Sequence, residues 1–210
     1  MTTLRFLVAG LLLAPAMLLA QSFEAGQDYQ VLDEPQSTTV DEGKVEVREF
    51  FSYACPHCRT FHPHMESLME SIGDKAELVH TPVVFNPSWE PLARAYMATR
   101  SLGVVDDTHG AIFSAVHDDN RQLTDADAIA EVVGEQGVSE DDFHDAWNSF
   151  SVDSDMRRSD RIARAYGVQS TPSVGIAGKY VVDVGQAGGQ ERMIDIIRYL
   201  VEKEYDERDQ

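Results

Sequence analysis

The cysteines of this 210-residue chain constrain its fold most strongly, because Cys55 and Cys58 are its only two and lie three positions apart. A pair at this spacing closes a very short loop and removes little chain entropy, so it cannot serve as a stabilising cage. The chain must therefore fold around an ordinary hydrophobic core. Its 43% hydrophobic and 25% charged residues are typical of a globular protein, and its length suits one large domain or a small domain carrying an insertion.

The first twenty residues have the pattern of a secretory signal. Arg5 supplies a positive start, an apolar run follows, and small residues precede a cleavage site that we place after Ala20. A membrane anchor is the alternative, but the run is shorter than the roughly 20 apolar residues that a span needs, and Pro15 interrupts it. We therefore expect an exported protein, in a compartment where disulfides persist.

Acidic residues dominate the charge of the chain. The 36 Asp and Glu residues against 17 Lys and Arg give a formal net charge of −19. Such an excess repels phosphates, so we expect no nucleic-acid partner. Thirteen of the acids, with only three bases, fall within residues 118–160. On amphipathic helices this pattern is typical of a solvated face, and we do not interpret it as a partner site.

Alternating and β-branched segments predict two strands near the start of the chain and a hairpin near its end. The first two strands are separated by a helix candidate at residues 55–72, and Gly178 separates the strands of the hairpin. The four expected strands are residues 44–51, 77–85, 173–177 and 179–184.

Between residues 88 and 167 the pattern changes to helices. Apolar residues at helical spacing, together with capping residues or a terminal glycine, mark segments that follow Ser88, Thr124 and Ser139 and a segment that ends before Gly167. In the segment after Ser139 the apolar stripe extends from Phe143 to Phe150. A last amphipathic helix contains Met193, Ile196, Ile197 and Leu200.

The segment Cys55-Pro56-His57-Cys58 carries the chemistry. At the start of a helix, Cys55 can occupy the N-cap and Pro56 the first helical position. Unpaired backbone N–H groups and the positive end of the helix dipole then favour a thiolate at Cys55, and a protonated His57 would add a cation beside it. Cys58, one turn further, is the resolving cysteine. Because stabilising the thiolate stabilises the reduced form, this pair is expected to give its disulfide to other thiols.

A metal site is the main alternative to a redox pair. Cys55, Cys58, His62 and His64 fall within ten residues, and two thiolates with two imidazoles suit zinc. However, the usual arrangement places a long separation between the cysteine and histidine pairs, and Pro63 lies between the two histidines. We therefore favour redox chemistry, expect no metal, and expect His62 and His64 to lie on the helix surface.

The segment FFSYACPHC, followed much later by Ser170-Thr171-Pro172-Ser173-Val174 and Gly178-Lys179-Tyr180, resembles the DsbA family of periplasmic thiol:disulfide oxidoreductases. The resemblance extends over nearly the whole chain after the signal segment. It implies an α/β structure, a thioredoxin fold with an inserted all-helical domain. We expect the thioredoxin-like domain at residues 21–87 and 168–210 and the inserted helical domain at 88–167.

The resemblance also implies a mechanism and partners. Cys55 would form a mixed disulfide with reduced, unfolded exported proteins in the periplasm, and Cys58 would resolve it. A membrane partner of the DsbB type, linked to quinone, would reoxidise the pair, so the disulfide itself would be the redox group and no cofactor would be needed. A disulfide isomerase or reductase uses the same motif, but such exported enzymes typically add a dimerisation domain. Residues 21–43 are too short for one, so we expect a monomer.

Three more residues match positions of the family. Thr171–Pro172 matches its cis-proline, which would present the Thr171 backbone to an extended substrate peptide. Glu49 matches its buried acid, which could move a proton to or from Cys58. The strand alternation agrees, because Glu49 is in phase with Val45 and other apolar residues, on a face where an unpaired carboxylate is costly. An edge glutamate that reaches solvent is the alternative.

Overall fold

The computed structural model describes residues 22–208, so the expected signal segment lies outside the described residues. Within them, five strands form one sheet in the order β1-β5-β4-β2-β3. β2 and β3 run parallel, and the other neighbouring pairs are antiparallel. The strands are β1 Gln30–Val31, β2 Val45–Phe51, β3 Ala76–Pro82, β4 Ser173–Ile176 and β5 Tyr180–Asp183.

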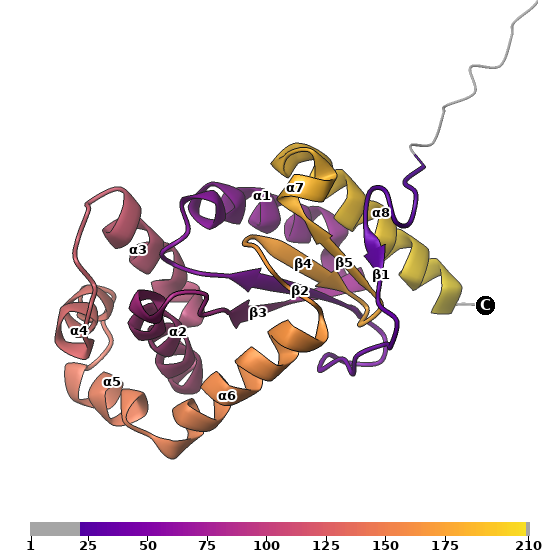
Figure 1. Ribbon diagram of the computed structural model, residues 1–210. Coiled ribbons are helices and arrows are strands. Elements are labelled where there is room, and N and C mark those ends of the chain that lie inside the picture. The colour runs from indigo at the N-terminus through magenta and orange to yellow at the C-terminus, as the bar shows by residue number, and fades with distance from the viewer. Residues whose placement is uncertain (1–21, 209–210) are drawn as a thin grey trace, which may run out of the picture.

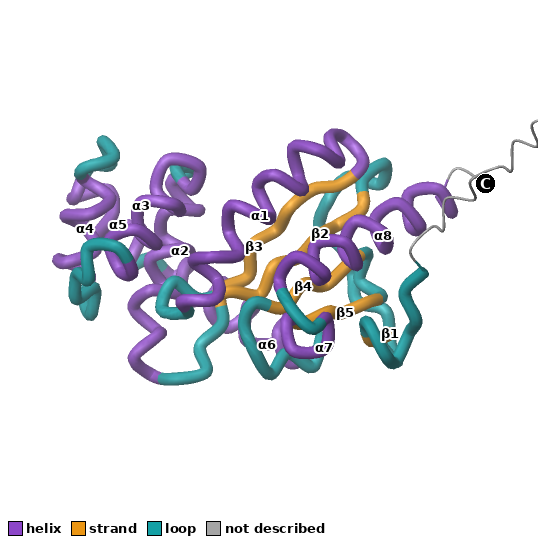
Figure 2. The backbone as a smooth tube through the Cα atoms, turned by 90° about the horizontal axis from the view of Figure 1, so that it is seen from above, coloured by secondary structure: helices purple, strands orange, loops and turns teal. Residues whose placement is uncertain are grey.

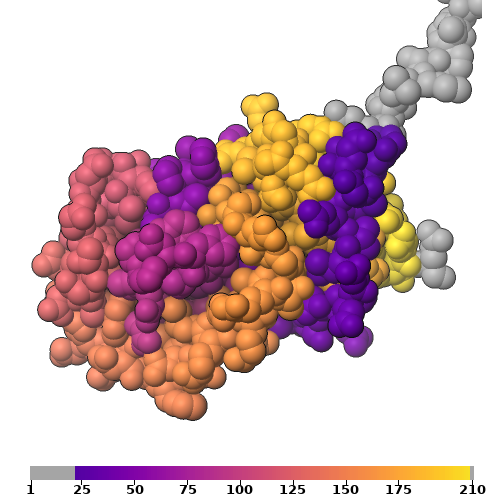
Figure 3. Space-filling view, in the orientation of Figure 1, coloured from indigo at the N-terminus to yellow at the C-terminus, as the bar shows by residue number. Residues whose placement is uncertain are grey.

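Helices cover both faces of the sheet and form a block at one end of it (Figure 1). α1 and α8 lie side by side over one face, as Figure 2 shows from above, and α6 lies against the opposite face. In Figure 3 the N-terminal segment (indigo) and α8 (yellow) lie at the end opposite this block. The helices are α1 Pro56–Ile72, α2 Glu90–Leu102, α3 Val105–His117, α4 Ala126–Gly134, α5 Glu140–Trp147, α6 Phe150–Ala165, α7 Val184–Ala187 and α8 Gln190–Arg208, with 3₁₀ turns at Gly73–Lys75 and Pro87–Trp89.

β2 lies between β4 and β3, and all seven of its residues are buried. The period of two along a strand divides them between the faces. Val45 and Val47 pack with α1 and α8 in the largest core cluster. On the other face, Phe50 packs with Ala163 of α6. Glu49 therefore lies on the face that α1 covers, as the sequence alternation predicts.

The helical block is inserted between β3 and β4, and Phe51 at the end of β2 joins it to the sheet. The Phe51 ring contacts Tyr53, Tyr96 of α2, and His109 and Phe113 of α3, at centroid distances of 5.1, 5.3, 5.1 and 6.0 Å. Phe51, Cys55 and Cys58 belong to the same buried cluster as the apolar faces of the block. The cysteine pair thus lies where the sheet and the inserted helices meet.

Most of the expected elements are confirmed, and three details are wrong. In addition, the sequence does not predict β1, α3 or α7. α5 ends at Trp147, so Phe150 is not in its apolar stripe; it begins α6 and is 79% exposed. The N-cap of α4 is Asp125, whose carboxylate accepts the Ala128 N–H, and not Thr124. β3 ends at Pro82, three residues before the expected end.

Among residues 22–208, no helix combines the length and the apolar character that a bilayer span requires.

The β4–β5 hairpin turns through Ala177 and Gly178, which both have positive φ, 54° and 70°. This is the geometry that matches the twist of a two-residue hairpin turn. The Gly178 carbonyl accepts the Gln36 N–H at 2.7 Å, so the turn also holds the N-terminal segment against the sheet. A Cβ at position 178 would collide with the carbonyl oxygen of Gln36.

We expect Gly178→Ala to lower the free energy of unfolding by about 2 kcal/mol or more, from the left-handed backbone and the collision together. Chemical denaturation measures the loss. Gly188→Ala is the matched control, because Gly188 has φ 77° and an added Cβ meets nothing within 4 Å. It should lose only about 1 kcal/mol. Equal losses in the two variants would show that the contact with Gln36 is unimportant.

Candidate active site

The pairing of β2 with β4 brings the cysteine pair to the Thr171–Pro172 bond. Phe50 lies opposite Ser173 in this antiparallel pair, so the end of β2 and the start of β4 share one edge of the sheet. Cys55 follows β2 closely, and Pro172 directly precedes β4. The Thr171–Pro172 bond is cis, as expected, and the Thr171 carbonyl oxygen lies 3.4 Å from Cys55 Sγ. The two motifs therefore form one site.

Cys55 caps α1 in the way that the sequence predicts. It is the N-cap residue, with φ −91° and ψ 115°, and Pro56 begins the helix. The Cys55 carbonyl accepts hydrogen bonds from the N–H groups of Cys58 and Arg59, at 3.1 and 3.2 Å. No acidic side chain lies in the first turn. The positive end of the helix dipole therefore acts on the Cys55 sulfur, and no negative side chain in the first turn weakens its effect.

These surroundings hold Cys55 as a thiolate, since they lower its pKa from 9.0 to about 5. The largest cause is the hydrogen bond from the Cys58 thiol, and Thr171 and the backbone N–H groups of Cys58 and His57 add to it. Burial raises the pKa of Cys55, which is only 6% exposed, but the causes that lower the pKa are larger together. At neutral pH the Cys55 sulfur is an anion.

Cys58 has the opposite environment. Its side chain is fully buried, and this burial raises its pKa far above the usual value for a thiol. The hydrogen bond to Cys55 and the negative charges of Cys55 and Glu49 raise the pKa further. Both cysteines are free of a disulfide in this structure. The reduced pair is thus one thiolate and one thiol that donates to it.

Glu49 is buried, and it has a partner that the sequence did not reveal. Its side chain is 2% exposed, which excludes the solvent-reaching alternative. Glu49 of β2 and His80 of β3 are register partners in the parallel pair, and Glu49 Oε2 lies 3.1 Å from His80 Nδ1. The two residues occupy the same position from the ends of their strands. That equivalence holds for the observed bounds of β2 and β3 and not for the strands expected from the sequence, so the sequence did not reveal the partner.

Two further histidines surround His80. The rings of His80 and His109 lie 4.5 Å apart, and those of His109 and His62 lie 4.9 Å apart. The expectation that His62 lies on the helix surface is wrong, because its side chain is 14% exposed and packs on His109 and Phe113. His64 is exposed, as expected. This histidine cluster could not be predicted from the sequence, since the sequence does not predict α3, which carries His109.

The structure places only the backbone of His57 in the site. Its N–H group contributes to the lowered pKa of Cys55, while its imidazole is exposed. Gln190, at the start of α8, donates to the His57 carbonyl at 2.8 Å and to the Thr60 hydroxyl at 3.1 Å. α8 therefore fixes the first turn of α1. The effect of a protonated His57 side chain on the sulfur stays a prediction.

The metal alternative lacks the geometry it would need. His64 is exposed, and His62 faces α3 rather than the sulfurs. Among the described residues, no three Cys, His, Asp or Glu side chains are arranged to hold a metal ion.

Comparisons with known proteins agree with the fold and with the geometry of the cysteine site. The DSBA-like thioredoxin domain family matches residues 46–196. The thiol:disulfide interchange protein DsbA of Pseudomonas aeruginosa is 32% identical, over 96% of this chain and 97% of that protein. Its crystal structure has a TM-score of 0.83 and covers 90% of this chain and 97% of that one. DsbA of Xylella fastidiosa has a TM-score of 0.80 at 29% identity, covering 86% and 97%.

The fold and the cysteine pair define a thiol:disulfide oxidoreductase of the thioredoxin class. The chain belongs to the DsbA family. The expected α/β thioredoxin fold with an inserted helical domain is confirmed.

We expect the alkylation rate of Cys55 in the reduced protein to follow a titration with its midpoint near pH 5, because the thiolate is the reactive species. Mass spectrometry of the alkylated protein measures the rate and should find Cys58 unmodified. Cys58→Ala removes the largest cause of the lowered pKa, so its midpoint should be higher. A wild-type midpoint near 9.0, the ordinary value, would contradict a stabilised thiolate.

The same ionisation makes the stability of the reduced protein depend on pH. A pKa that is lower in the folded protein stabilises it fully above the unfolded value, 9.0, and this contribution disappears as the pH falls to about 5. Cys58 stays a thiol in the folded protein and is mostly a thiol in the unfolded protein until the pH approaches 9.0, so it contributes little across this window. The free energy of unfolding of the reduced protein, minus that of the oxidised protein, should therefore rise from pH 5 to pH 9. A constant difference would contradict the assignment.

Proposed function

We propose that this protein oxidises newly exported proteins by giving them its Cys55–Cys58 disulfide. The observation that carries the proposal is the opposite ionisation of the two sulfurs, with the pKa of Cys55 lowered to about 5 and that of Cys58 raised. A stabilised thiolate favours the reduced pair, and a pair that is stable when reduced is an oxidant when bonded. The disulfide is then the redox group, and no other cofactor takes part.

The transfer proceeds by two exchanges. A substrate thiolate attacks Cys55 Sγ, the Cys55–Cys58 bond breaks, and a mixed disulfide with the substrate forms. The electron pair of the broken bond goes to Cys58, which takes up a proton. A second substrate thiolate then attacks the substrate sulfur of the mixed disulfide, and Cys55 leaves as its stable thiolate. The substrate dithiol is oxidised to a disulfide, and the enzyme disulfide is reduced to Cys55 thiolate and Cys58 thiol.

Glu49 supplies the proton that Cys58 needs. Cys58 is fully buried, so bulk water does not reach its sulfur directly. The negative charge of Glu49 is one of the causes that raise the pKa of Cys58, after burial and the effects of Cys55. The protonated carboxyl group gives a proton to Cys58 when the disulfide opens, and the carboxylate takes it back when the disulfide forms again.

The edge of the sheet that carries Cys55 suits an extended, unfolded client. The Thr171 backbone lies beside the sulfur and presents hydrogen-bonding groups to a peptide. β3 ends at the same edge as β2, and beyond it Val84 and Phe85 are 41% and 46% exposed. A DsbA of Proteus mirabilis that is similar in fold, with a TM-score of 0.73 at 23% identity, has been solved with a non-covalently bound peptide. We propose that a client peptide binds here along Thr171–Pro172.

The remaining features of the proposal follow from the family. The protein acts in the periplasm as a monomer, after removal of residues 1–20, and a DsbB-type membrane protein linked to quinone reoxidises it. Its thioredoxin-like domain consists of residues 21–87 and 168–210, and its inserted domain of residues 88–167. These limits fall just outside α2 and α6, the first and last helices of the insertion.

Oxidation of a reduced, unfolded protein that needs one disulfide tests the function. The wild-type protein should oxidise it in a stoichiometric single turnover. Cys58→Ala, first loaded as a mixed disulfide between Cys55 and glutathione, should exchange glutathione for the substrate and accumulate the Cys55–substrate disulfide, because no Cys58 thiol is present to attack it. Cys55→Ala should form no such adduct. Mass spectrometry under non-reducing conditions detects the adduct.

Equilibration with glutathione buffers distinguishes an oxidase from a reductase. The wild-type pair should stay reduced in buffers that leave ordinary structural disulfides intact. A strongly reducing potential, or oxidation by Cys55→Ala at the wild-type rate, would overturn the proposed function.

A further inference from the structure

A layer of polar side chains lies between the sheet and α6, on the face opposite α1. Arg48 of β2 is at its centre and is only 5% exposed. Its guanidinium donates from Nε and Nη2 to the Glu46 carboxylate, at 2.9 and 2.8 Å. It also donates from Nη1 to the Thr81 hydroxyl at 2.9 Å and from Nη2 to the Thr39 hydroxyl at 3.2 Å. The second hydrogen of Nη1 has no acceptor among the described residues.

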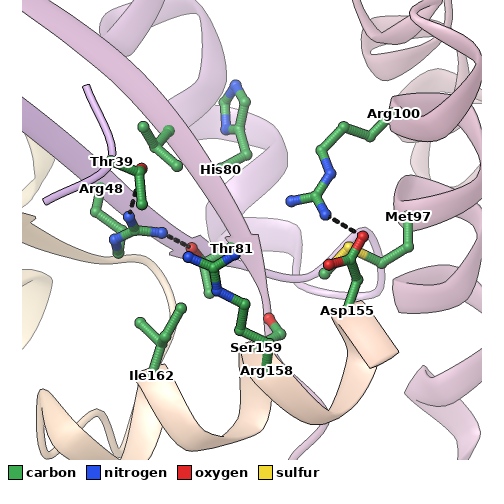
Figure 4. Close-up of a pocket in the computed structure, with 11 residues that line it drawn as sticks. Thr39, Arg48, His80, Thr81, Met97, Arg100, Asp155, Arg158, Ser159 and Ile162 are labelled. Carbon is green, nitrogen blue, oxygen red and sulfur yellow. Dashed lines mark hydrogen bonds and ion pairs between the residues drawn. The ribbon is translucent and has the colours of Figure 1, made fainter. Parts of the chain in front are cut away.

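Two cavities border this layer. One, of about 230 Å³, extends along the free edge of β3 (Figure 4), and the other has a volume of about 190 Å³. Both are lined by Thr39, Arg48, Arg158 and Ile162, so they adjoin one another around Arg48. Each has room for several water molecules or for one small ion.

The charged residues of these cavities leave one positive charge without a partner. Arg48 is held by Glu46, and Arg100 of α2 is held by Asp155 of α6 at 2.6 Å. Arg158 of α6 forms no hydrogen bond or ion pair with any described residue. In Figure 4 its side chain points from α6 toward Arg48 and away from Asp155. The unpaired charge therefore faces the polar layer.

Tyr166, the residue after α6, adds a buried donor to the smaller cavity, which it lines. It is 2% exposed, and its hydroxyl has no hydrogen-bond partner. Its ring lies against Gly175 of β4, the register partner of Arg48, so Tyr166 and Arg48 are neighbours on this face of the sheet. Burial raises the pKa of Tyr166, and Arg48 lowers it by less, although no hydrogen bond joins the two side chains. The hydroxyl is therefore protonated at neutral pH and can donate.

Several hydrogen-bond donors without acceptors thus line the two cavities. They are the second hydrogen of Arg48 Nη1, the hydroxyls of Thr81 and Tyr166, and the guanidinium of Arg158. A buried donor that lacks an acceptor destabilises the folded protein, so an acceptor bound here would be favourable.

The arrangement of these donors selects the shape of the acceptor. They come from β2, β3 and α6 and so approach the cavities from different directions. A planar carboxylate binds best to one side of a guanidinium through two parallel hydrogen bonds. On Arg48 that side is already occupied by Glu46. An ion with oxygens in several directions fits the remaining donors better.

We propose that the two adjoining cavities form a binding site for a small tetrahedral oxyanion, of which inorganic phosphate is the simplest. Arg158 supplies the unpaired charge, while Thr81 and Tyr166 donate from the sheet side. The net charge of −19 repels anions in general, so attraction has to come from contacts within this site. Because the site lies across the sheet from α1, its ligand is separate from the thiol chemistry.

Titration of the purified, oxidised protein with phosphate at constant ionic strength tests the site. Calorimetry should give saturable binding with a Kd below about 10 mM. At ten times its Kd, phosphate should raise the Tm by about 3 °C or more, because it binds only the folded protein. Chloride should produce neither effect, and acetate should bind at least about fivefold more weakly than phosphate.

Two substitutions locate the binding. Arg158→Gln should weaken phosphate binding about tenfold, since it removes the unpaired charge. Its matched control is Arg157→Gln, which removes the same charge from the neighbouring exposed residue, whose guanidinium lies over the Phe150 ring. This control should stay within about twofold of the wild type.

Tyr166→Phe removes a hydroxyl that makes no hydrogen bond in the protein. Without phosphate its Tm should therefore be no lower than that of the wild type. Its affinity for phosphate should nevertheless fall about fivefold, since one donor to the ion is lost. A role in folding alone would not produce this combination.

A free ion and a phosphate group on a larger molecule are two sources of the same chemistry. Arg158 is exposed, so the ligand can reach it from solvent. Sulfate and glycerol phosphate, titrated in the same way, distinguish the two sources. Binding of sulfate alone would indicate a site for free ions, and binding of glycerol phosphate as tightly as phosphate would indicate a site for phosphate esters. Both results support an oxyanion site.

Three results would overturn the site. They are the absence of saturable phosphate binding below about 10 mM, equal weakening in Arg158→Gln and Arg157→Gln, and wild-type affinity in Tyr166→Phe. The first is measured on the wild-type protein and decides the proposal even if a variant fails to fold. None of them bears on disulfide exchange, so the proposed function is tested separately.

Discussion

The antiparallel pairing of β2 with β4 is the constraint on which the site depends. It sets the end of one strand beside the beginning of the other, and so brings Cys55 to the carbonyl of Thr171 across more than a hundred residues of sequence. α1 begins at Pro56, shortly after β2 ends at Phe51, and its first turn brings unpaired N–H groups to the sulfur of its N-cap residue, Cys55. Strand register, helix capping and sulfur ionisation therefore form one causal chain.

The inserted helices do more than cover the sheet. Phe51, at the end of β2, is enclosed by rings from α2 and α3, and the same buried cluster contains both cysteines. The inserted block thus helps to remove Cys58 from water, which is the main cause of its raised pKa. The core that stabilises the block and the chemistry of the resolving cysteine share the same packing.

The sequence predicted the parts of the site that local rules determine. The capping role of Cys55 follows from Pro56 behind it, and the burial of Glu49 follows from the alternation of β2. His80 could not be found in this way, because its contact with Glu49 depends on the register between two strands separated by a helix. α3 was missed because Thr108 and His109 lie on its buried face and interrupt the apolar period. Residues whose position is set by tertiary packing rather than by their neighbours in sequence were the ones that escaped prediction.

The unequal depth of the two sulfurs has a consequence for selectivity. Cys55 retains 6% of its surface, and Cys58 retains none. An incoming nucleophile can therefore approach the bond from one end alone, and every productive encounter cleaves it with the same regiochemistry. A mixed disulfide on Cys58 would be a dead-end complex. Because the Cys58 sulfur is inaccessible, such adducts do not form, whatever the reactivity of the nucleophile.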